Sequence, residues 1–500
     1  MSGVRPVTRS RDTGAAAMGR RLSFIGGQVV TGCGVAMLPA ALVSVLYGET
    51  SSAVAIGSAA AITIAAGTLA WHLIGTKGVL TIKEGFGAVG MAWLVMSAFG
   101  TLPYLLSGSI PGIADAFFEA TSGFTTTASS ILPDPSALPR GVLFWRSTTQ
   151  WVGGMSIIVL SIAVLPLLGI GGAQLARPES PGPVSERLTP RLKETAKRLW
   201  FVYVGLTAVE AILLWLGDMT LFQAVNHAFT TMSTGGFGTE STSITGFSSY
   251  TQWVMIGFMF LAGASFALHY RALRRPGEYL RSAEFSLYSF IVFGGVVIIV
   301  GGLLGPGVEI ASAVRDATFT AVSIITTTGY TTADFGAWRP ALQVFVVGLM
   351  FFGGMAGSTA GGVKTYRIGI LSKAAEVDLR RLVHPRGVFV IRFGKDRLRE
   401  EIVESVQSFF LFYMFLFMTG TFLLSFLDAN ASEQLDLITT ASAVASSLGN
   451  IGPGLGEIGP AGHYAGLPGS GKWLLSGLMI IGRLEIFPVL LLFTRDLWRR

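Results

Sequence analysis

The sequence predicts an all-α polytopic membrane protein, and three features of its composition support this fold class. Hydrophobic residues make up 51% of the 500 residues, charged residues make up only 13%, and mean hydropathy is +0.60. Soluble globular chains carry about 25% charged residues, which argues against a soluble globular protein, a disordered chain, a coiled coil and a nucleic-acid-binding protein, despite a net charge of +7. The 64 glycines permit close helix packing and irregular backbone around a polar cavity. The single cysteine, Cys33, excludes a disulfide framework and a thiolate metal site.

Ten apolar runs are long enough to cross the roughly 30 Å hydrocarbon core of a membrane. The first run is longer than a signal-peptide core and lacks a small-residue cleavage site, so it is predicted to be a retained span. Four shorter stretches, rich in Thr, Ser and Gly, are predicted to be re-entrant segments because they are too short and too polar to cross. The spans are 22–47, 52–74, 86–107, 141–168, 199–216, 249–270, 285–305, an interrupted 338–373, 403–427 and 473–494. The re-entrant stretches are 115–130, 220–238, 314–332 and 434–454.

The distribution of charge supports this topology and predicts that both termini are cytoplasmic. With the N-terminus inside, the inner segments hold thirty of the 36 basic residues, as expected because Lys and Arg are retained in the cytoplasm. The acidic residues do not share this bias, since thirteen lie outside and fourteen inside. The outer face therefore carries a net charge of −8. An outer mouth of this charge concentrates cations.

The four re-entrant stretches resemble one another. Aligning their ends makes Ala128, Gly236, Gly329 and Gly452 equivalent, at separations of 108, 93 and 123 residues. A period near one hundred residues that occurs four times indicates an internal repeat. We therefore expect a leading helix pair followed by four span–pore-helix–span repeats, in a pseudo-fourfold arrangement around one pore. The predicted parts are a basic cytoplasmic tail (1–21), the leading helix pair (22–84), and four pore repeats (85–198, 199–284, 285–402 with an intramembrane glycine loop, and 403–500).

The residue types in each repeat favour binding of a monovalent cation. An acidic residue near the start of each short helix (Asp115, Asp218, Asp316 or Asp436) opposes the positive end of the helix dipole, so the negative end faces the axis. Small residues and a glycine follow, which allow backbone carbonyls to turn inward and replace the hydration shell of the ion. One such loop equally fits an external turn, but four matched copies favour a filter. The predicted ion-binding residues are Thr126, Thr127, Ala128, Thr234, Gly235, Gly236, Thr327, Thr328, Gly329, Asn450, Ile451 and Gly452.

These motifs resemble the superfamily of potassium transporters that comprises the bacterial TrkH and KtrB proteins and the plant HKT proteins, with the TrkH family as the nearest match. The resemblance implies gated, channel-like potassium uptake in the cell inner membrane. It also implies a homodimer and a cytosolic TrkA-like regulatory subunit that carries the nucleotide. No cofactor is expected in this chain beyond bound K⁺, and Na⁺ stays open as a second bound ion. The segments that carry it are Thr121-SGFTTT, Ser233-TGGF, Thr326-TTGYTT, Ser447-LGNIGPGL, Gly353-GMAGSTAGGVK and Gly482-RLEIFP.

One residue departs from the family pattern. The first filter loop of the family usually ends in glycine, whereas this chain has Ala128. In the plant relatives, serine at this position accompanies sodium permeation, so the resemblance implies weaker potassium-over-sodium selectivity here. Two backbone conformations are open for Ala128. At positive φ, its methyl group costs roughly 1–2 kcal/mol or narrows the ring, whereas at ordinary φ it costs nothing and stabilises the fold.

A glycine-rich segment, Gly353–Gly362, interrupts the eighth span. Each of its five glycines would cost about 1 kcal/mol relative to alanine in a regular helix. One interpretation is close helix packing through small residues. The other is an unwound intramembrane gate beneath the filter, which the resemblance favours, because irregular backbone is tolerated only where it is buried in protein or lines a wet cavity. The predicted gate residues are Gly353, Gly354, Gly357, Ser358, Thr359, Gly361, Gly362 and Arg483.

Arg483 is predicted to lie near the middle of the last span, where an arginine costs at least about 2.5–3.5 kcal/mol and needs a partner or water. A structural ion pair with Glu210, or bonds to helix carbonyls, would satisfy it. The resemblance instead implies contact with the glycine loop and a positive barrier in the pore. Lys364 is expected to extend to the inner surface, and His227 is expected to be a packing residue.

Two other function classes compete with a gated cation pore. A secondary solute carrier typically has two inverted repeats around a midplane site, whereas four repeats in one orientation are expected here. A membrane-embedded enzyme needs clustered acids, histidines or a nucleophile with its base, and the spans contain almost none. The sequence therefore predicts a transport protein and no enzyme activity.

Overall fold

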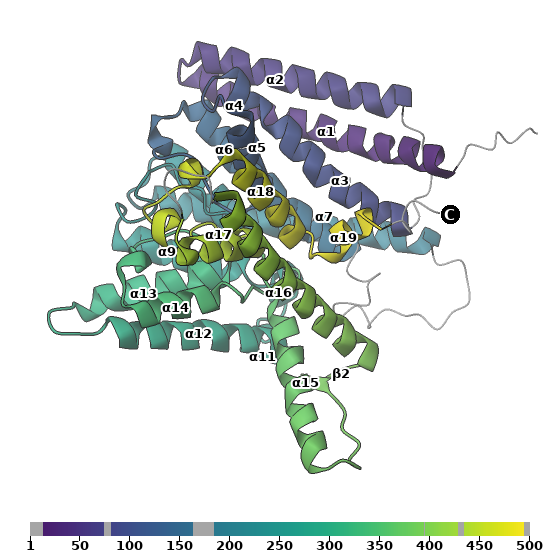
Figure 1. Ribbon diagram of the computed structural model, residues 1–500. Helices are drawn as coiled ribbons and strands as arrows, with labels where there is room; N and C mark the ends of the chain where they lie inside the picture. The colour runs from purple at the N-terminus through teal and green to yellow at the C-terminus, as the bar shows by residue number, and fades with distance from the viewer. Residues whose placement is uncertain (1–13, 75–81, 164–184, 395, 429–434, 495–500) are drawn as a thin grey trace, which may run out of the picture.

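The structure is a computed structural model that describes residues 14–74, 82–163, 185–394, 396–428 and 435–494. Helices dominate these residues, which confirms the predicted all-α class (Figure 1). One small exception is an antiparallel hairpin of two two-residue strands, β1 (Arg392–Phe393) and β2 (Asp396–Arg397). Six of the described helices are long and apolar enough to cross a membrane, or seven if one bent pair forms a single span. The chain is therefore a multi-pass membrane protein.

The leading pair consists of α1 (Gly14–Leu46) and α2 (Thr50–Leu69), which continues into a π-helical turn, Ala70–Ile74. The two helices cross closely because glycine lines their contact. A Cβ atom on Gly67 would lie 2.5 Å from the backbone nitrogen of Thr31. Small residues at such crossings allow backbones to approach within membranes.

The rest of the chain follows the predicted order of a long helix, a short helix and a second long helix. The short helices are α5 (Ile113–Phe124), α8 (Leu221–Met232), α13 (Ile310–Ile325) and α17 (Leu437–Gly449). Before them lie α3 (Ile82–Gly100) with α4 (Leu102–Leu106), α7 (Ser185–Trp215), α11 (Glu278–Arg281) with α12 (Ala283–Leu303), and α16 (Glu400–Asp428). After them lie α6 (Arg140–Ala163), α9 (Ser249–Ala262) with α10 (Phe266–Ala272), α14 (Pro340–Leu349) with α15 (Thr365–Val383), and α18 (Gly469–Arg483) with α19 (Phe487–Leu492). Short 3₁₀ turns occur at Pro135–Ala137, Phe335–Ala337, Gly456–Ile458 and Tyr464–Gly466.

Two predicted spans are broken where the sequence suggested continuous helices. The span 249–270 bends by 101° between α9 and α10, at Gly263–Ser265. The last span breaks after Arg483, where Glu485 and Ile486 have positive φ values of 59° and 66°. Pro488 follows directly and cannot donate a helical hydrogen bond, which disfavours continuation of α18.

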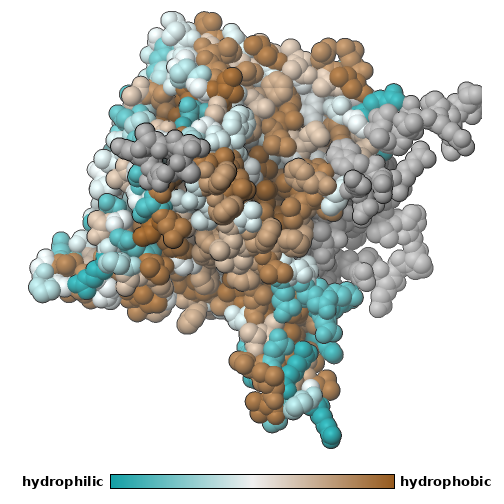
Figure 2. All heavy atoms as spheres, in the orientation of Figure 1, coloured by the Kyte–Doolittle hydropathy of each residue, from teal (hydrophilic) through white to brown (hydrophobic). Residues whose placement is uncertain are grey.

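The eighth span is interrupted as predicted, since no helix is present between Leu349 and Thr365. Beyond this break, α15 projects from the helical body as an arm, and the chain then returns to the β1–β2 hairpin, whose Phe393 lies against Gly369 near the start of α15 (Figure 1). In the face shown in Figure 2, hydrophobic side chains cover the middle of the body, and hydrophilic ones gather on the arm and at the left end. Residues 1–13 of the predicted basic tail (1–21), and residues 164–184 and 495–500, lie outside the described residues.

Candidate functional site

The four loops that follow the short helices share one backbone conformation. In each loop, two residues separated by one have positive φ, a conformation that is uncommon outside glycine. The first member is never glycine: Thr126, Thr234, Thr327 and Asn450 have φ values of 54°, 53°, 57° and 54°. The second member is Ala128 (64°), Gly236 (78°), Gly329 (83°) or Gly452 (112°). Of the two backbone conformations that the sequence left open for Ala128, the structure therefore has the strained one, with positive φ.

The same loops contact one another through their backbones. A Cβ atom on Gly236 would overlap the carbonyl oxygen of Thr328, and one on Gly329 would overlap that of Ile451. A Cβ atom on Gly452 would lie 2.8 Å from the carbonyl oxygen of Thr127 and 2.8 Å from the Cβ of Ala128. The Cβ of Ala128 would also lie 3.2 Å from a Cβ atom on Gly236. The second loop thus touches the third and the first, the third touches the fourth, and the fourth touches the first. The four loops close into a ring.

Side chains from neighbouring loops tie this ring together. The amide of Asn450 in the fourth loop donates to the hydroxyl of Thr127 in the first loop, at 2.9 Å. The hydroxyl of Tyr330 in the third loop bonds to Thr230 and to His227 Nδ1, both on the second short helix. His227 is therefore a hydrogen-bonding partner of the ring in addition to being a buried packing residue.

A buried ion pair behind the first two loops was missed in the sequence. Glu119 of α5 and Arg146 of α6 are 0% and 3% exposed and lie 2.6 Å apart. Glu119 also accepts the backbone N–H of Ile131 at 3.0 Å, and Arg146 donates to the carbonyl of Gly238 at 2.9 Å. The pair therefore links the first loop of the ring to the second.

Two of the four acidic residues predicted near the starts of the short helices, Asp436 and Asp115, lie there. Asp436 caps α17 by accepting the N–H of Thr439 at 2.8 Å, and Asp115 lies in the first turn of α5 and pairs with Lys472 at 2.5 Å. The prediction is wrong for Asp316, which is the seventh residue of α13 because that helix begins earlier than expected.

Asp218 lies two residues before Thr220, the N-cap residue of the short helix α8, but its carboxylate binds Ser248, the N-cap residue of α9. Its carboxylate accepts the N–H of Ser248 at 2.7 Å and the hydroxyl of Thr251 at 2.5 Å. Partial burial acts to raise the pKa of Asp218, but the hydrogen bonds from Thr251 and Ser248 outweigh burial and lower the pKa from its ordinary value.

The glycine loop between α14 and α15 lies directly against the ring. The N–H of Gly361 donates to the hydroxyl of Thr327 in the third loop of the ring at 2.7 Å. The hydroxyl of Thr359 donates to the carbonyl of Met232, the last residue of the second short helix, at 3.1 Å. Glycine is required at 361 because a Cβ atom there would overlap the carbonyl oxygen of Gly449. The loop is therefore irregular backbone buried in protein.

Arg483 touches this loop, as the resemblance implied. Its guanidinium donates to the carbonyl of Thr359 at 2.6 Å and to the carbonyl of Gly153 in α6 at 3.4 Å. The alternative partner, Glu210, is fully buried, and no hydrogen bond to either of its carboxylate oxygens is present among the described residues.

Two further charged residues lie beside the loop, and both make contacts that the sequence did not predict. Lys364 is only 4% exposed and donates to the carbonyl of Ala360, so the expectation that it extends to the inner surface is wrong. Glu485, at the break after α18, pairs with Arg367 of α15 at 2.5 Å. The α18–α19 break is thereby tied to the helix that follows the glycine loop.

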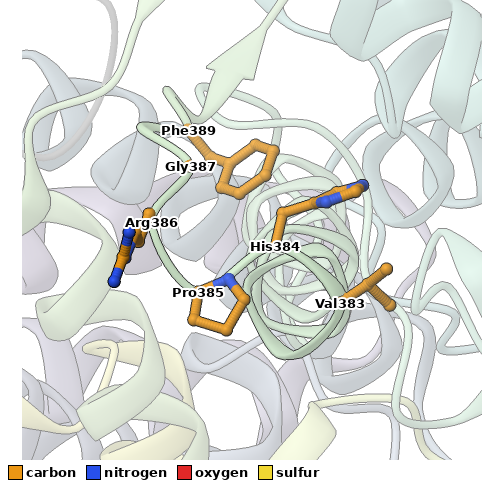
Figure 3. Close-up of a pocket in the computed structure, with 6 residues that line it drawn as sticks. All are labelled: Val383, His384, Pro385, Arg386, Gly387 and Phe389. Atoms are coloured by element: carbon orange, nitrogen blue, oxygen red, sulfur yellow. The ribbon is translucent and has the colours of Figure 1, made fainter.

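One surface pocket lies away from the ring (Figure 3). It is at the far end of α15, a helix of 19 residues and thus about 28 Å long. No group of three or more His, Cys, Asp or Glu side chains that could hold a metal ion occurs in the described part of the chain. The pocket is lined by Val383, His384, Pro385, Arg386, Gly387 and Phe389.

Comparison with known proteins supplies the family. Residues 52–285 and 306–499 match the family model TrkH, which is described as a cation transport protein. The chain belongs to the TrkH family. Among its TrkH relatives, the Trk system potassium uptake protein TrkH of Escherichia coli strain K12 is 41% identical over 431 residues, which cover 85% of this chain and 87% of that protein. The protein of the same name from Vibrio parahaemolyticus is 38% identical over 482 residues, covering 93% and 96%.

The three-dimensional structure agrees with that of a TrkH protein. The crystal structure of the potassium transporter TrkH from Vibrio parahaemolyticus matches with a TM-score of 0.86 at 36% identity. The match covers 96% of this chain and 99% of that chain. TrkH membership also means that the chain is a transport protein and not an enzyme.

Proposed function

We propose that this TrkH-family protein takes up potassium across the cell membrane through a gated, channel-like pore. The observation that carries the proposal is the closed ring of four loops with one shared backbone conformation. The relatives of known function are named as potassium uptake proteins, which supports K⁺ as the transported ion.

The ring is well suited to bind a dehydrated monovalent cation. Alternating positive and negative φ turns successive carbonyls of each loop to the same side, and rings of such carbonyls replace the water around the ion. Among the described residues, no hydrogen bond ends on the carbonyls of Thr127, Thr328 or Ile451. These oxygens are therefore free to coordinate an ion. Each loop also follows the C-terminal end of a short helix, whose dipole contributes about half a negative charge there.

The glycine loop and Arg483 form the proposed gate. The loop contacts the third filter loop through Gly361 and Thr327, and Arg483 holds it through the carbonyl of Thr359. A guanidinium beside the conducting path repels cations electrostatically. Movement of the loop would therefore displace both a steric block and a charge.

The proposed setting follows the family resemblance and the charge distribution. We place the protein in the cell inner membrane as a homodimer with both termini in the cytoplasm. A TrkA-like cytosolic subunit would carry the regulatory nucleotide. The inner segments are rich in Lys and Arg, which supports this orientation.

The alternatives are a weakly selective potassium/sodium conductor and a secondary ion-coupled solute carrier. Reversal potentials of the purified protein in planar bilayers, with K⁺ on one side and Na⁺ on the other, separate the three functions. The proposal expects a reversal potential displaced far from zero, with the sign that selectivity for K⁺ requires. A reversal potential near zero would indicate a weakly selective conductor. A flux that requires a second solute would contradict the channel-like pathway.

A further inference from the structure

One buried position, in the helix that follows each short helix, holds a different type of residue in the first unit from that in the other three. The eleventh residue counted from the start of α6, α9, α14 and α18 is Gln150, Met259, Met350 and Met479, respectively. All four side chains are 0% exposed. Three units therefore fill this position with methionine, and only the first unit places an amide there.

The backbone supports the equivalence of these positions. A Cβ atom on Gly153, three residues after Gln150, would overlap the carbonyl of Phe124, which lies two residues before Thr126. A Cβ atom on Gly482, three residues after Met479, would overlap the carbonyl of Leu448, which lies two residues before Asn450. The helix that carries the amide thus meets its short helix in the same way as the helix that carries a methionine.

Gln150 binds the second filter loop at two points. Its Nε2 donates to the carbonyl of Gly235 at 2.8 Å, and its Oε1 accepts the N–H of Phe237 at 3.1 Å. Gly235 has no side chain where the other loops have Thr127, Thr328 and Ile451. A Cβ atom there would overlap the amide of Gln150. The amide therefore occupies the space that belongs to a filter side chain in the other three loops.

The Gly235 carbonyl also faces a different neighbour from its equivalents. In the ring, the carbonyls of Thr328 and Ile451 lie so close to a glycine of the next loop that a Cβ atom there would overlap them. The carbonyl of Thr127 would lie 2.8 Å from a Cβ atom on Gly452. By the same pattern, the Gly235 carbonyl would lie against residue 128, which carries a methyl group. A real methyl carbon cannot occupy that position, because atoms at such a separation overlap. The carbonyl must turn aside, and Gln150 is its hydrogen-bond donor.

We propose that Ala128 and Gln150 act as a specificity-determining pair, which withdraws the Gly235 carbonyl from the ring and leaves three carbonyls at this level. The inference rests on the proposed filter. A ring with three coordinating carbonyls in place of four binds K⁺ less well relative to its hydration shell. Ala128 blocks the inward position of the carbonyl and Gln150 stabilises the outward one, so either residue alone suffices to retain much of the asymmetry. Gln150 is a positioning residue because it acts through the carbonyl of Gly235.

A double-mutant cycle in bi-ionic bilayer recordings tests the pair. The variants are Ala128→Gly, Gln150→Met and the double variant, and the readout is the potassium/sodium permeability ratio. We expect Ala128→Gly alone to raise the ratio by about twofold, Gln150→Met alone to change it by less than about twofold, and the double variant to raise it by about tenfold. Coupling of about threefold or more supports the pair. Effects that multiply without such coupling overturn it, because the residues would then act independently. Gln150→Leu replaces Gln150→Met if the latter does not fold.

Two further variants separate this test from that of the proposed function. Gln343 of α14 donates to the carbonyls of Gly336 and Trp338 outside the ring, so Gln343→Met serves as a control that leaves the ratio unchanged. Gly329→Ser alters the ring itself. A changed ratio in Gly329→Ser together with an uncoupled Ala128–Gln150 cycle refutes only the pair. An unchanged ratio in Gly329→Ser refutes the filter.

Discussion

The ring of four loops and the glycine loop are both irregular backbone buried in the same helical body, but they are held in different ways. Each filter loop is shaped by backbone contacts with equivalent residues of its neighbours, as at Gly236 and Gly329. The glycine loop has no equivalent neighbours: its Met355 N–H donates to the carbonyl of Gly263 at 2.8 Å in the α9–α10 break, and Arg483 donates to its Thr359 carbonyl. Because the ring closes on itself, moving one of its loops disturbs all four, whereas the glycine loop can move relative to the ring by exchanging the contacts of Gly361, Thr359 and Arg483. This difference suits a filter and a gate, respectively.

The largest expected effect comes from a side chain added within the ring. Gly236→Ser and Gly329→Ser place a Cβ atom over a neighbouring carbonyl, and overpacking costs typically about 1–3 kcal/mol. We expect potassium uptake to fall by about tenfold or more in both variants. Gly452→Ser should be milder, since its Cβ would lie 2.8 Å from the nearest atoms. Uptake assays at matched expression check this order, and parent-like transport by all three would show that the loops do not form the filter.

The next effect concerns the brace between the first two loops. Arg146→Leu leaves Glu119 buried without its ion-pair partner, which typically costs about 3–5 kcal/mol. We expect a marked loss of thermal stability of the purified protein in detergent. Arg198→Ala is the matched control, because its ion pair with Glu194 is exposed and worth about 0.5 kcal/mol or less. Equal melting temperatures for the two variants would show that the buried pair is not a brace.

Loss of Arg483 should affect flow and leave ion preference unchanged. A unit charge about 10 Å from the ion, at an effective dielectric constant near 20, changes its energy by about 1.7 kcal/mol. Arg483→Ala is therefore expected to raise basal flux by about tenfold without altering the permeability ratio. Shortening the loop Gly353–Gly362 should have the same result, and the double variant should be non-additive. Normal basal flux in both single variants would favour the packing interpretation of the loop.

The smallest expected effect is that of the one methyl group in the ring. Ala128 has φ of 64°, where a residue other than glycine is strained by roughly 1–2 kcal/mol. Ala128→Gly should raise the potassium/sodium permeability ratio by about twofold, since Gln150 still holds the Gly235 carbonyl. The variant should also melt at a higher temperature, because relief of this strain exceeds the roughly 0.4–1 kcal/mol that glycine contributes to the entropy of the unfolded chain. Identical reversal potentials for parent and variant would show that position 128 does not influence selectivity.

The fold and the ring residues could be predicted because they leave periodic signals in the sequence. The spans are apolar runs of a required length, and the four loops repeat small residues and glycine at matched positions. The interrupted helix was visible because Gly353–Gly362 concentrates glycine where a span is expected. A broken helix with a weaker signal, at Gly263–Ser265, was missed.

The supporting contacts could not be predicted because they join residues far apart in the chain. Arg146 and Gln150 bond to the second loop across 92 and 85 residues. A signal was present, however. The two residues lie four apart and thus on one face of α6, and polar side chains within a span are expensive unless they have partners. A polar face on a predicted span should have been interpreted as a contact with irregular backbone.

Direct localisation of the transported ion tests the central claim that the four loops bind it. Crystals of the parent protein grown with Tl⁺ in place of K⁺ would give anomalous scattering at each bound ion. We predict a peak on the axis of the ring, within coordination distance of the carbonyls of Thr127, Thr328 and Ile451. The Gly235 carbonyl should lie farther from the peak than those three. A protein that transports Tl⁺ but shows its anomalous peaks only outside the ring would contradict the assignment.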